Sequence, residues 1–405
     1  MSTLRKVAVV GAGSVNAVGL TVNEFWEGLI AGRCGIGPVD LFDTSAYRTH
    51  IGGQVRGLDA GLHFGKKELR RMSRCDIFGL IAAREAVEDS GLNLRSIDRE
   101  RAGVILGGGA GGMLSGEKYR RELHNGGHPR PSLLMPFATN YTTDLIAVEF
   151  GFGGPRSTVV TACSSSSTSV GYAADMIRRG DADIIITGGS DAMCQLTYAG
   201  FNSLRAVDEN PCRPFDANRK GLSLGEGAGM LVLEEMEHAK ARGARIYAEL
   251  AGYGIAGDAY HMTAPDTAGA GAARAISAAL LDAGLEPREV DYINAHGTAT
   301  KFNDVAETAA IRAVFGGHAD RLAVSSIKSM TGHCLGSAGG IEAVATALTV
   351  YHGIIPPTIN FETPDPQCDI DCTPNIARRS DIRAALSNSL AFGGNNTSVV
   401  FKRAI

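Results

Sequence analysis

Short runs of valine and isoleucine, bounded by glycines, alternate along this chain with alanine-rich segments of helical periodicity. Strands buried on both faces have this continuous apolar pattern, so we expect an α/β fold with a mostly parallel sheet. The runs lie at 6–10, 102–106, 158–161, 183–187, 230–234, 290–294, 322–325 and 397–401. The spacing of apolar residues predicts helices over 67–89, 164–179, 271–283, 305–315 and 339–351. Gly180 and Gly353 are expected to end two of these helices.

The order of elements repeats near residue 250, where a helical tract gives way to a new strand at 246–254. In each half a strand leads to an alanine-rich helix and then to a short strand with a site-like residue at its end. That residue is Cys163 in the first half and His296 in the second. Because no low-complexity linker separates them, we expect two similar halves, residues 1–250 and 251–405, that pack as one body.

Composition and charge exclude several classes of protein. The 405 residues are 44% hydrophobic, enough for a large core, and carry a net charge of −4. Binding to nucleic acid or to an anionic membrane would need a basic excess. The apolar stretches are far shorter than the roughly 20 residues that span a bilayer, and the N-terminus leads into a strand without a signal-peptide pattern. We therefore expect a cytoplasmic protein that binds neither nucleic acid nor membrane.

The eight cysteines are spread along the chain without a CxxC pair, so reduced thiols are expected rather than a disulfide framework. Cys368 and Cys372 have three residues between them but lack a second ligand pair, so they are interpreted as loop thiols and no metal site is predicted.

Two glycine motifs resemble known signatures without matching them. Gly11 and Gly13 follow a strand, but Asn16 stands where a dinucleotide-binding turn needs its third glycine, so a tight strand-to-helix turn is expected instead. The GLSLG segment contains Ser223 in a G-x-S-x-G pattern. A nucleophile elbow needs a strand before the serine and a helix after it, whereas here a loop precedes and a strand follows. Ser223 is therefore predicted to be a loop residue.

Cys163 has the sequence context of a nucleophile. A β-branched strand ends at this cysteine, and a helix that begins with four serines follows it directly. The thiol should therefore lie at a helix N-terminus, where free backbone N–H groups and the helix dipole lower its pKa.

Two histidines share this strand-end context. His296 ends a strand in NAHGTAT, and His333 follows a strand in SSIKSMTGH. Neutral imidazole N–H groups directed at one carbonyl oxygen would stabilise an enolate or oxyanion, so we expect both histidines in one site with Cys163.

Charged residues near the histidines are interpreted as support for this site. Asp304 and Glu307 lie three residues apart at a helix start, which places them on one face, and a buried Lys328 would require such a counter-charge. Phe392 precedes Gly393 and Gly394 in a loop before the last strand, where glycine permits a close approach of N–H groups to a ligand.

Five motifs carry a resemblance to a known family. They are TACSSS around Cys163, GEGAGMLVLE at 225–234, NAHGTAT around His296, SSIKSMTGH with Lys328 and His333, and AFGG at Phe392. In this order, over nearly the whole chain, they resemble the elongating β-ketoacyl-acyl-carrier-protein synthases, condensing enzymes of the thiolase superfamily. The resemblance implies a thiolase-like fold, with two similar βαβαβ halves in a five-layered α-β-α-β-α body.

The resemblance also implies an activity. Cys163 would accept an acyl chain, with the N–H groups of Cys163 and Phe392 as oxyanion hole. His296 and His333 would hold the thioester carbonyl of malonyl-carrier protein during a decarboxylative Claisen condensation that adds two carbons in fatty-acid or related synthesis. Phe392 and Gly393 would form a gate, and the acyl pocket is assigned to Ala110, Leu133 and Ala162.

The partner implied by the resemblance is an acyl carrier protein that brings acyl and malonyl thioesters on its own phosphopantetheine, so no other cofactor and no metal are expected. Carrier proteins are acidic, and the segment 66–74 holds five basic residues and one acidic residue. The predicted docking patch comprises Lys66, Lys67, Arg70, Arg74 and Arg205. The family also implies a homodimer, through strands such as 183–187, or a heterodimer with a related subunit.

Three alternatives remain open at this stage. Ala110 stands where a bulky aliphatic residue is usual, Leu390 replaces an aromatic residue, and the segment TATKFND is similar to type II polyketide synthases. A ketosynthase of a type II polyketide or polyene pathway is therefore an alternative. A non-catalytic partner subunit would lack the nucleophile, which Cys163 supplies. A degradative thiolase would need a second cysteine near the C-terminus, and AFGGNN has none.

Overall fold

A computed structural model describes residues 5–404. Within them, ten strands join in one mixed sheet, and two smaller pairs are formed by β2 (Gly37–Pro38) with β3 (Ile51–Gly52) and by β11 (Ile354–Ile355) with β12 (Arg378–Arg379). The ten strands are β1 (Val7–Asn16), β4 (Ala102–Gly107), β5 (Arg156–Val159), β6 (Ile184–Asp191), β7 (Gly227–Glu235), β8 (Ala248–Gly257), β9 (Tyr292–Asn294), β10 (Ala323–Ser325), β13 (Ala384–Ala391) and β14 (Asn395–Lys402). Every predicted strand falls on one of them, and β13 is the strand that the sequence analysis missed.

The expectation of a mostly parallel sheet is wrong. The strand order is β10-β9-β13-β14-β8-β1-β7-β6-β4-β5. Five neighbouring pairs are antiparallel, β1 with β7, β1 with β8, β13 with β14, β14 with β8 and β6 with β7. Only four pairs are parallel. An antiparallel strand covered by helices on both faces has the same continuous apolar pattern as a parallel one, so the sequence could not separate them.

The two halves of the sheet have the same pairing pattern. From each outer edge, β5-β4-β6-β7-β1 and β10-β9-β13-β14-β8, two parallel pairs are followed by two antiparallel pairs. The halves meet where Ala8 and Val9 of β1 pair with Glu249 and Ala248 of β8. This repeat supports the predicted division into residues 1–250 and 251–405, which stays a prediction.

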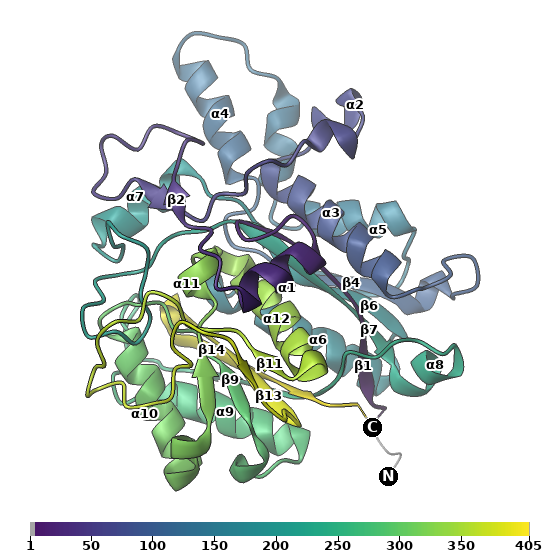
Figure 1. Cartoon of the computed structure of the whole chain (residues 1–405). Helices are drawn as coiled ribbons and strands as arrows, with labels where there is room; N and C mark the ends of the chain where they lie inside the picture. Colours follow the sequence, from purple (N-terminus) through teal and green to yellow (C-terminus); the bar gives the residue numbers. More distant parts are fainter. Residues whose placement is uncertain (1–4, 405) are drawn as a thin grey trace.

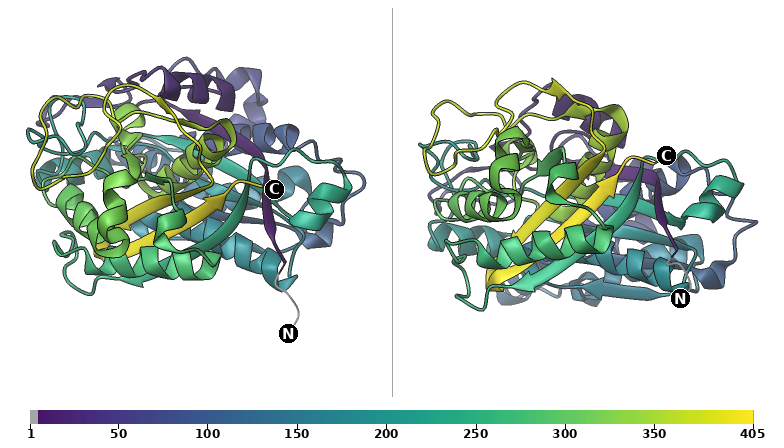
Figure 2. Two further views of the ribbon diagram at one scale, coloured as in Figure 1. Left: turned by 60° about the horizontal axis from the view of Figure 1, so that its bottom comes forward. Right: turned by 90° about the horizontal axis from the view of Figure 1, so that it is seen from below.

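Helices complete the five-layered body that the resemblance implies (Figures 1 and 2). The helices are α1 (Val22–Ile30), α2 (Lys66–Leu69), α3 (Arg74–Asp89), α4 (Met113–His124), α5 (Tyr141–Phe150), α6 (Ser165–Arg179), α7 (Gln195–Ser203), α8 (Met236–Ala241), α9 (Ala270–Ala283), α10 (Asn303–Phe315), α11 (Lys328–Thr331) and α12 (Ala338–His352). Helices α3 and α5 cover the outer face of the first half of the sheet, and α9, with α10 against it, covers that of the second. Helices α6 and α12 lie between the halves. No helix within residues 5–404 is long and apolar enough to cross a membrane.

The middle layer explains the run of small residues after Cys163. Ser164 to Ser167 are buried, and each hydroxyl has a partner. The Ser166 hydroxyl accepts a hydrogen bond from the backbone N–H of Gly340 on α12 at 2.8 Å, and the Ser167 hydroxyl lies 2.7 Å from that of Ser389 on β13. Small polar side chains therefore let two buried helices and a strand pack closely at the point where the nucleophile is placed.

The predicted tight turn at Gly11 and Gly13 is wrong, because β1 continues through both glycines to Asn16. A Cβ at Gly11 would lie 2.1 Å from the backbone oxygen of Ala86, and one at Gly13 would lie 2.0 Å from that of Ala82. The two glycines thus allow α3 to pack directly against the strand.

The predicted helix over 67–89 is interrupted. It is divided into α2 and α3 because Ser73 caps α3, its hydroxyl accepting from the N–H of Asp76 while the Asp76 carboxylate accepts from the N–H of Ser73. The ends at Gly180 and Gly353 are confirmed, since both residues have the left-handed backbone conformation.

The strand expected at a dimer interface is not at an edge. Strand β6, which contains most of 183–187, lies between β4 and β7, so its backbone groups are already paired. The edge of this half is β5, whose outer side has no strand partner within the described residues.

Candidate active site

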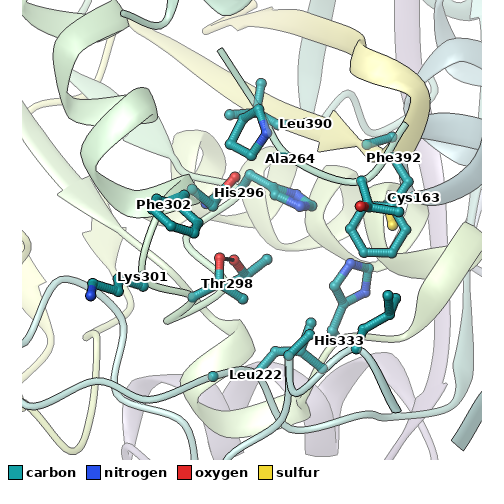
Figure 3. Close-up of a pocket in the computed structure, with 18 of the residues that line it drawn as sticks. Cys163, Leu222, Ala264, His296, Thr298, Lys301, Phe302, His333, Leu390 and Phe392 are labelled. Atoms are coloured by element: carbon teal, nitrogen blue, oxygen red, sulfur yellow. Dashed lines mark hydrogen bonds between the residues drawn. The ribbon is translucent and has the colours of Figure 1, made fainter. Parts of the chain in front are cut away.

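The three residues predicted to be catalytic line one cavity of about 300 Å³. Cys163 lies in the 3-10 turn Ala162–Ser164 directly before the central helix α6, whereas His296 follows β9 and His333 follows α11. The imidazole rings of His296 and His333 are 5.3 Å apart between centroids and nearly perpendicular. Figure 3 shows both rings on the same side of the cavity as Cys163, with Lys301 at the opposite end.

Cys163 lies at the helix start, as predicted, but its pKa does not follow the prediction. Ala162, directly before it, has a φ of 52°, a left-handed conformation that is costly for a residue with a side chain and typical of functional sites. Burial raises the pKa of the Cys163 thiol to about 11, against the opposing effects of Lys328 and of the backbone N–H groups of Phe392 and Cys163. Desolvation of the thiolate therefore outweighs the stabilisation expected from the helix N-terminus.

Hydrogen bonds assign the same tautomer to both histidines. Nδ1 of His296 accepts from Lys328 Nζ at 3.3 Å, and Nδ1 of His333 accepts from the backbone N–H of Leu335 at 3.1 Å. Burial lowers the pKa of His333 to about 3 and that of His296 well below its ordinary value. Each neutral ring therefore carries its proton on Nε2, so the site contains two N–H donors.

The predicted counter-charge for Lys328 is wrong. Lys328 is buried as expected, but its ammonium group is paired with Glu342 on α12 rather than with Asp304 or Glu307. Burial raises the pKa of Glu342 to about 7, opposed by Lys328. Sequence reasoning missed Glu342, although a single glutamate within the apolar helix AGGIEAVATALTV is a signal for a buried charge with a partner.

Asp304 and Glu307 instead hold the loop that carries His296. The Glu307 carboxylate accepts from the backbone N–H groups of His296 and Gly297, both at 2.8 Å. Asp304 accepts from the N–H of Ala299 at 3.1 Å and from that of Phe215 at 2.8 Å. Both carboxylates are fully buried, and burial raises the pKa of Glu307 to about 7. Both side chains therefore contact the loop backbone beside His296, and their supporting role in the site stays a prediction.

The backbone of His333 is fixed on both sides by the GLSLG segment at 221–225. Its N–H donates to the carbonyl of Ser223 at 2.7 Å, and its carbonyl accepts from the N–H of Gly225 at 2.9 Å. Ser223 is a buried loop residue, as predicted, and its hydroxyl accepts from the N–H of Cys212.

Phe392 and Gly393 lie in the short turn between β13 and β14. The Phe392 ring stacks on Phe201 of α7 with 5.5 Å between centroids. Gly393 has a φ of 78°, which favours glycine, and its N–H donates to the carbonyl of Met262 at 2.8 Å. The expected unusual backbone geometry is thus present directly after Phe392, which lies next to Cys163 (Figure 3).

None of the predicted acyl-pocket residues lines this cavity. Ala162 directly precedes Cys163, which does line it. Ala110 is buried in a separate apolar cluster with Met193 and Leu335, and Leu133 is half-buried in the 3-10 helix Pro131–Phe137. Their role as an acyl pocket stays a prediction.

The predicted docking patch is divided by the structure. Lys66, Lys67 and Arg70 are exposed on and after α2, outside the cavity. Arg205 is exposed at the cavity itself, together with two cations that the sequence analysis missed, Lys220 and Lys301. Arg74 does not belong to an exposed patch, because its guanidinium is paired with the fully buried carboxylate of Glu226 at 2.6 Å.

The part of the chain that the structure describes contains no set of side chains placed to bind a metal ion. Residues 5–404 contain no group of three or more His, Cys, Asp or Glu side chains placed to hold a metal ion. The eight cysteines are free thiols, and Cys368 and Cys372 are buried.

Comparison with known sequences identifies the family. The models of the β-ketoacyl synthase N-terminal and C-terminal domains match residues 4–239 and 247–362. The chain belongs to the β-ketoacyl synthase family. It is 44% identical to 3-oxoacyl-[acyl-carrier-protein] synthase 2 of Staphylococcus aureus strain COL, over 100% of this chain and 99% of that protein. The enzyme of the same name from Synechocystis sp. is also 44% identical, over 98% of each chain. Membership makes this β-ketoacyl synthase an acyltransferase of the condensing type.

Solved structures give the same fold. A chain of the ishigamide ketosynthase/chain length factor is similar with a TM-score of 0.95 and 39% identity, covering 99% of this chain and 100% of that one. A second similar chain belongs to a type II PKS acyl-carrier protein in complex with its ketosynthase bound to the hexaketide. Its TM-score is 0.91 and its identity is 35%, covering 99% of this chain and 100% of that one.

Proposed function

We propose that this β-ketoacyl synthase extends a carrier-bound acyl chain by two carbons through decarboxylative Claisen condensation, in fatty-acid or related synthesis. One observation carries the proposal. A buried thiol, Cys163, shares a cavity with two neutral imidazoles, His296 and His333, that each offer an Nε2–H group. A thiol can hold an acyl group, and two fixed donors can stabilise the oxyanion of an enolate.

In the first half-reaction, Cys163 Sγ attacks the thioester carbonyl of an acyl-carrier protein. The developing oxyanion accepts hydrogen bonds from the backbone N–H groups of Cys163 and Phe392. The carbonyl carbon then loses its bond to the carrier sulfur, which leaves with the proton from the Cys163 thiol. Because the pKa of this thiol is about 11, its proton is expected to depart with the attack rather than before it.

In the second half-reaction, the thioester carbonyl of malonyl-carrier protein accepts from the Nε2–H groups of His296 and His333. The carbon–carbon bond to the terminal carboxylate breaks, carbon dioxide leaves, and the electron pair of that bond forms an enolate. The enolate carbon attacks the acyl carbonyl on Cys163, the carbon–sulfur bond breaks, and the thiolate takes a proton from water. The product is a β-ketoacyl chain on the carrier.

The carrier protein would supply the phosphopantetheine arm, so the enzyme itself needs no other cofactor for these steps. Phe392 and Gly393 are proposed as the gate of the cavity, and Ala110, Leu133 and Ala162 as the acyl pocket. The acidic carrier would dock on Lys66, Lys67 and Arg70, with Arg205, Lys220 and Lys301 at the cavity entrance. A cytoplasmic location accords with the eight free thiols.

We propose a homodimer whose interface includes the edge strand β5. An open strand edge is a template for pairing with a second copy, and Val160, directly after β5, is 54% exposed. A heterodimer is the alternative, because one similar structure, 28% identical with a TM-score of 0.86, is a ketosynthase in complex with its chain length factor. Mass measurement of the purified protein at increasing concentration distinguishes a homodimer from a monomer.

A second candidate function is the ketosynthase step of a type II polyketide pathway. The similarity to the hexaketide-bound ketosynthase favours it. Repeated extension by the enzyme of one starter chain would support this candidate, whereas release after a single extension would support the fatty-acid function.

The proposed function is tested with purified enzyme, acyl-carrier protein and malonyl-carrier protein. Mass spectrometry should find the acyl group on Cys163, and addition of malonyl-carrier protein should release carbon dioxide and give the β-ketoacyl product. The Cys163→Ala variant should form neither the acyl-enzyme nor the product. Acylation at another residue, or condensation by the variant, would overturn the assignment.

A further inference from the structure

One carboxylate that the proposed chemistry does not use holds two loops together. Asp191, the last residue of β6, is fully buried. Its Oδ1 accepts from the N–H groups of Ala110 and Gly111 at 2.8 and 2.9 Å, and its Oδ2 accepts from those of Gly109 and Gly336 at 2.9 and 2.7 Å. Four backbone donors therefore surround a single buried anion.

These donors come from loops with different roles. Gly109, Ala110 and Gly111 belong to the loop after β4, whereas Gly336 belongs to the loop that follows His333. The loops touch so closely that a Cβ at Gly336 would lie 2.6 Å from the backbone of Gly108 and Gly109. Asp191 thus occupies the junction between the proposed acyl pocket and the loop of a proposed catalytic histidine.

Leu335 connects this junction to the chemistry. It has a φ of 54°, and its side chain packs in the same apolar cluster as Ala110. Its backbone N–H is the donor that fixes the tautomer of His333. The hydrogen bond from Gly336 to Asp191 restrains the peptide that follows Leu335, so it helps to keep this residue in its strained conformation.

We propose that Asp191 is a positioning residue that couples acyl-chain selection at Ala110 to the orientation of His333. The proposal rests on the proposed function, in which Ala110 contacts the acyl chain and His333 holds the malonyl carbonyl. Only a carboxylate offers acceptor sites to all four N–H groups, because an amide of the same size presents donors on one side. Without the carboxylate the two loops separate, and the position of the acyl pocket is no longer fixed relative to that of His333.

The principal test is the Asp191→Asn variant, with Asp216→Asn as matched control. Asp216 is also fully buried and accepts from three backbone N–H groups, those of Asn218, Glu362 and Thr363, but it lies outside the cavity. We measure kcat and KM with acyl-carrier proteins bearing a short and a long acyl chain. Hydrogen exchange is followed at the amides of Gly109, Ala110, Gly111 and Gly336.

For Asp191→Asn we expect the ratio of kcat/KM between long and short chains to change by about tenfold or more, with kcat also reduced and exchange at the four amides accelerated. For Asp216→Asn we expect a ratio within about twofold of wild type. An unchanged ratio for Asp191→Asn, or an equal change in both variants, overturns the proposal. Wild-type enzyme that does not condense would instead refute the proposed function, while the exchange measurement still reports on the junction.

Gly336→Ala is the second variant if Asp191→Asn fails to fold. It keeps the carboxylate, but its Cβ would lie 2.7 Å from Asp191 Oδ2 and must force the loops apart. The same change in chain-length ratio is expected, and wild-type selectivity in Gly336→Ala would contradict the coupling.

Discussion

Lys328 Nζ lies 3.3 Å from Nδ1 of His296 and is also paired with the carboxylate of Glu342. One buried ammonium group therefore connects a charge on the central helix α12 to the tautomer of a histidine on another loop. Because Nδ1 accepts this bond, the ring must present Nε2–H to the cavity. The buried ion pair thus fixes the tautomer of His296, and this role explains why a pair that is costly to desolvate is present.

We first predict that Glu342→Gln strongly destabilises the protein. The substitution leaves Lys328 buried without an anion, which should lower the free energy of unfolding by about 3–5 kcal/mol. Urea denaturation measures the change. The control is Glu237→Gln, which removes an exposed partner of Lys240 and should change the free energy by less than about 1 kcal/mol. Equal effects of the two substitutions would show that the buried pair contributes no more than a surface pair.

The roles of the two half-reactions should separate in His333→Ala. This variant loses one of the two proposed donors to the malonyl carbonyl, so decarboxylation should fall by about 10²–10³-fold. Acylation of Cys163 should persist, because its proposed oxyanion hole uses backbone N–H groups. Carbon dioxide release and intact-protein mass measure the two steps. Retained condensation, or loss of acylation equal to the loss of decarboxylation, would contradict the division of roles.

The reactivity of Cys163 should increase with pH over the whole accessible range. Since burial raises the pKa of the thiol to about 11, the thiolate fraction should rise about tenfold per pH unit below that value. Alkylation by iodoacetamide, quantified at the Cys163 peptide between pH 6 and 9, measures this fraction. A rate that levels off near neutral pH would mean that the helix N-terminus outweighs desolvation after all.

Most strands could be predicted from the local sequence, because valine and isoleucine runs indicate buried strands whatever their neighbours in the fold. Strand β13 was missed for a physical reason. Its central residues Ser387, Asn388 and Ser389 are buried and polar, and they find partners such as Ser167 and Glu307 only in the folded protein. Strand direction could not be predicted from the sequence either, since parallel and antiparallel strands between helix layers bury the same faces.

The candidate site shows the same limit. Cys163, His296 and His333, which line one cavity, could be singled out as candidates because each follows a strand or short helix within a motif. The partner of Lys328 could not be chosen from spacing, because Glu342 reaches it from another helix while Asp304 and Glu307 turn to backbone N–H groups. Desolvation of Cys163 likewise depends on the surrounding layers rather than on its own segment.

Carrier docking provides the last prediction, and the structure divides it into two parts. Lys66→Glu with Arg70→Glu reverses charge outside the cavity, whereas Lys220→Glu with Lys301→Glu reverses it at the entrance. Both double variants should raise KM for acyl-carrier protein, by about tenfold at low salt and less at high salt, because an acidic partner is attracted through screened charges.

A small acyl thioester without a carrier separates the two surfaces. It does not reach the first pair, so the Lys66 and Arg70 variant should use it as well as wild type does. The entrance variant should keep normal use of an uncharged thioester and lose use of one that carries a phosphate. Equal effects of the first variant on carrier-linked and small substrates would remove α2 from the docking surface, and unchanged phosphate dependence in the second would remove Lys220 and Lys301.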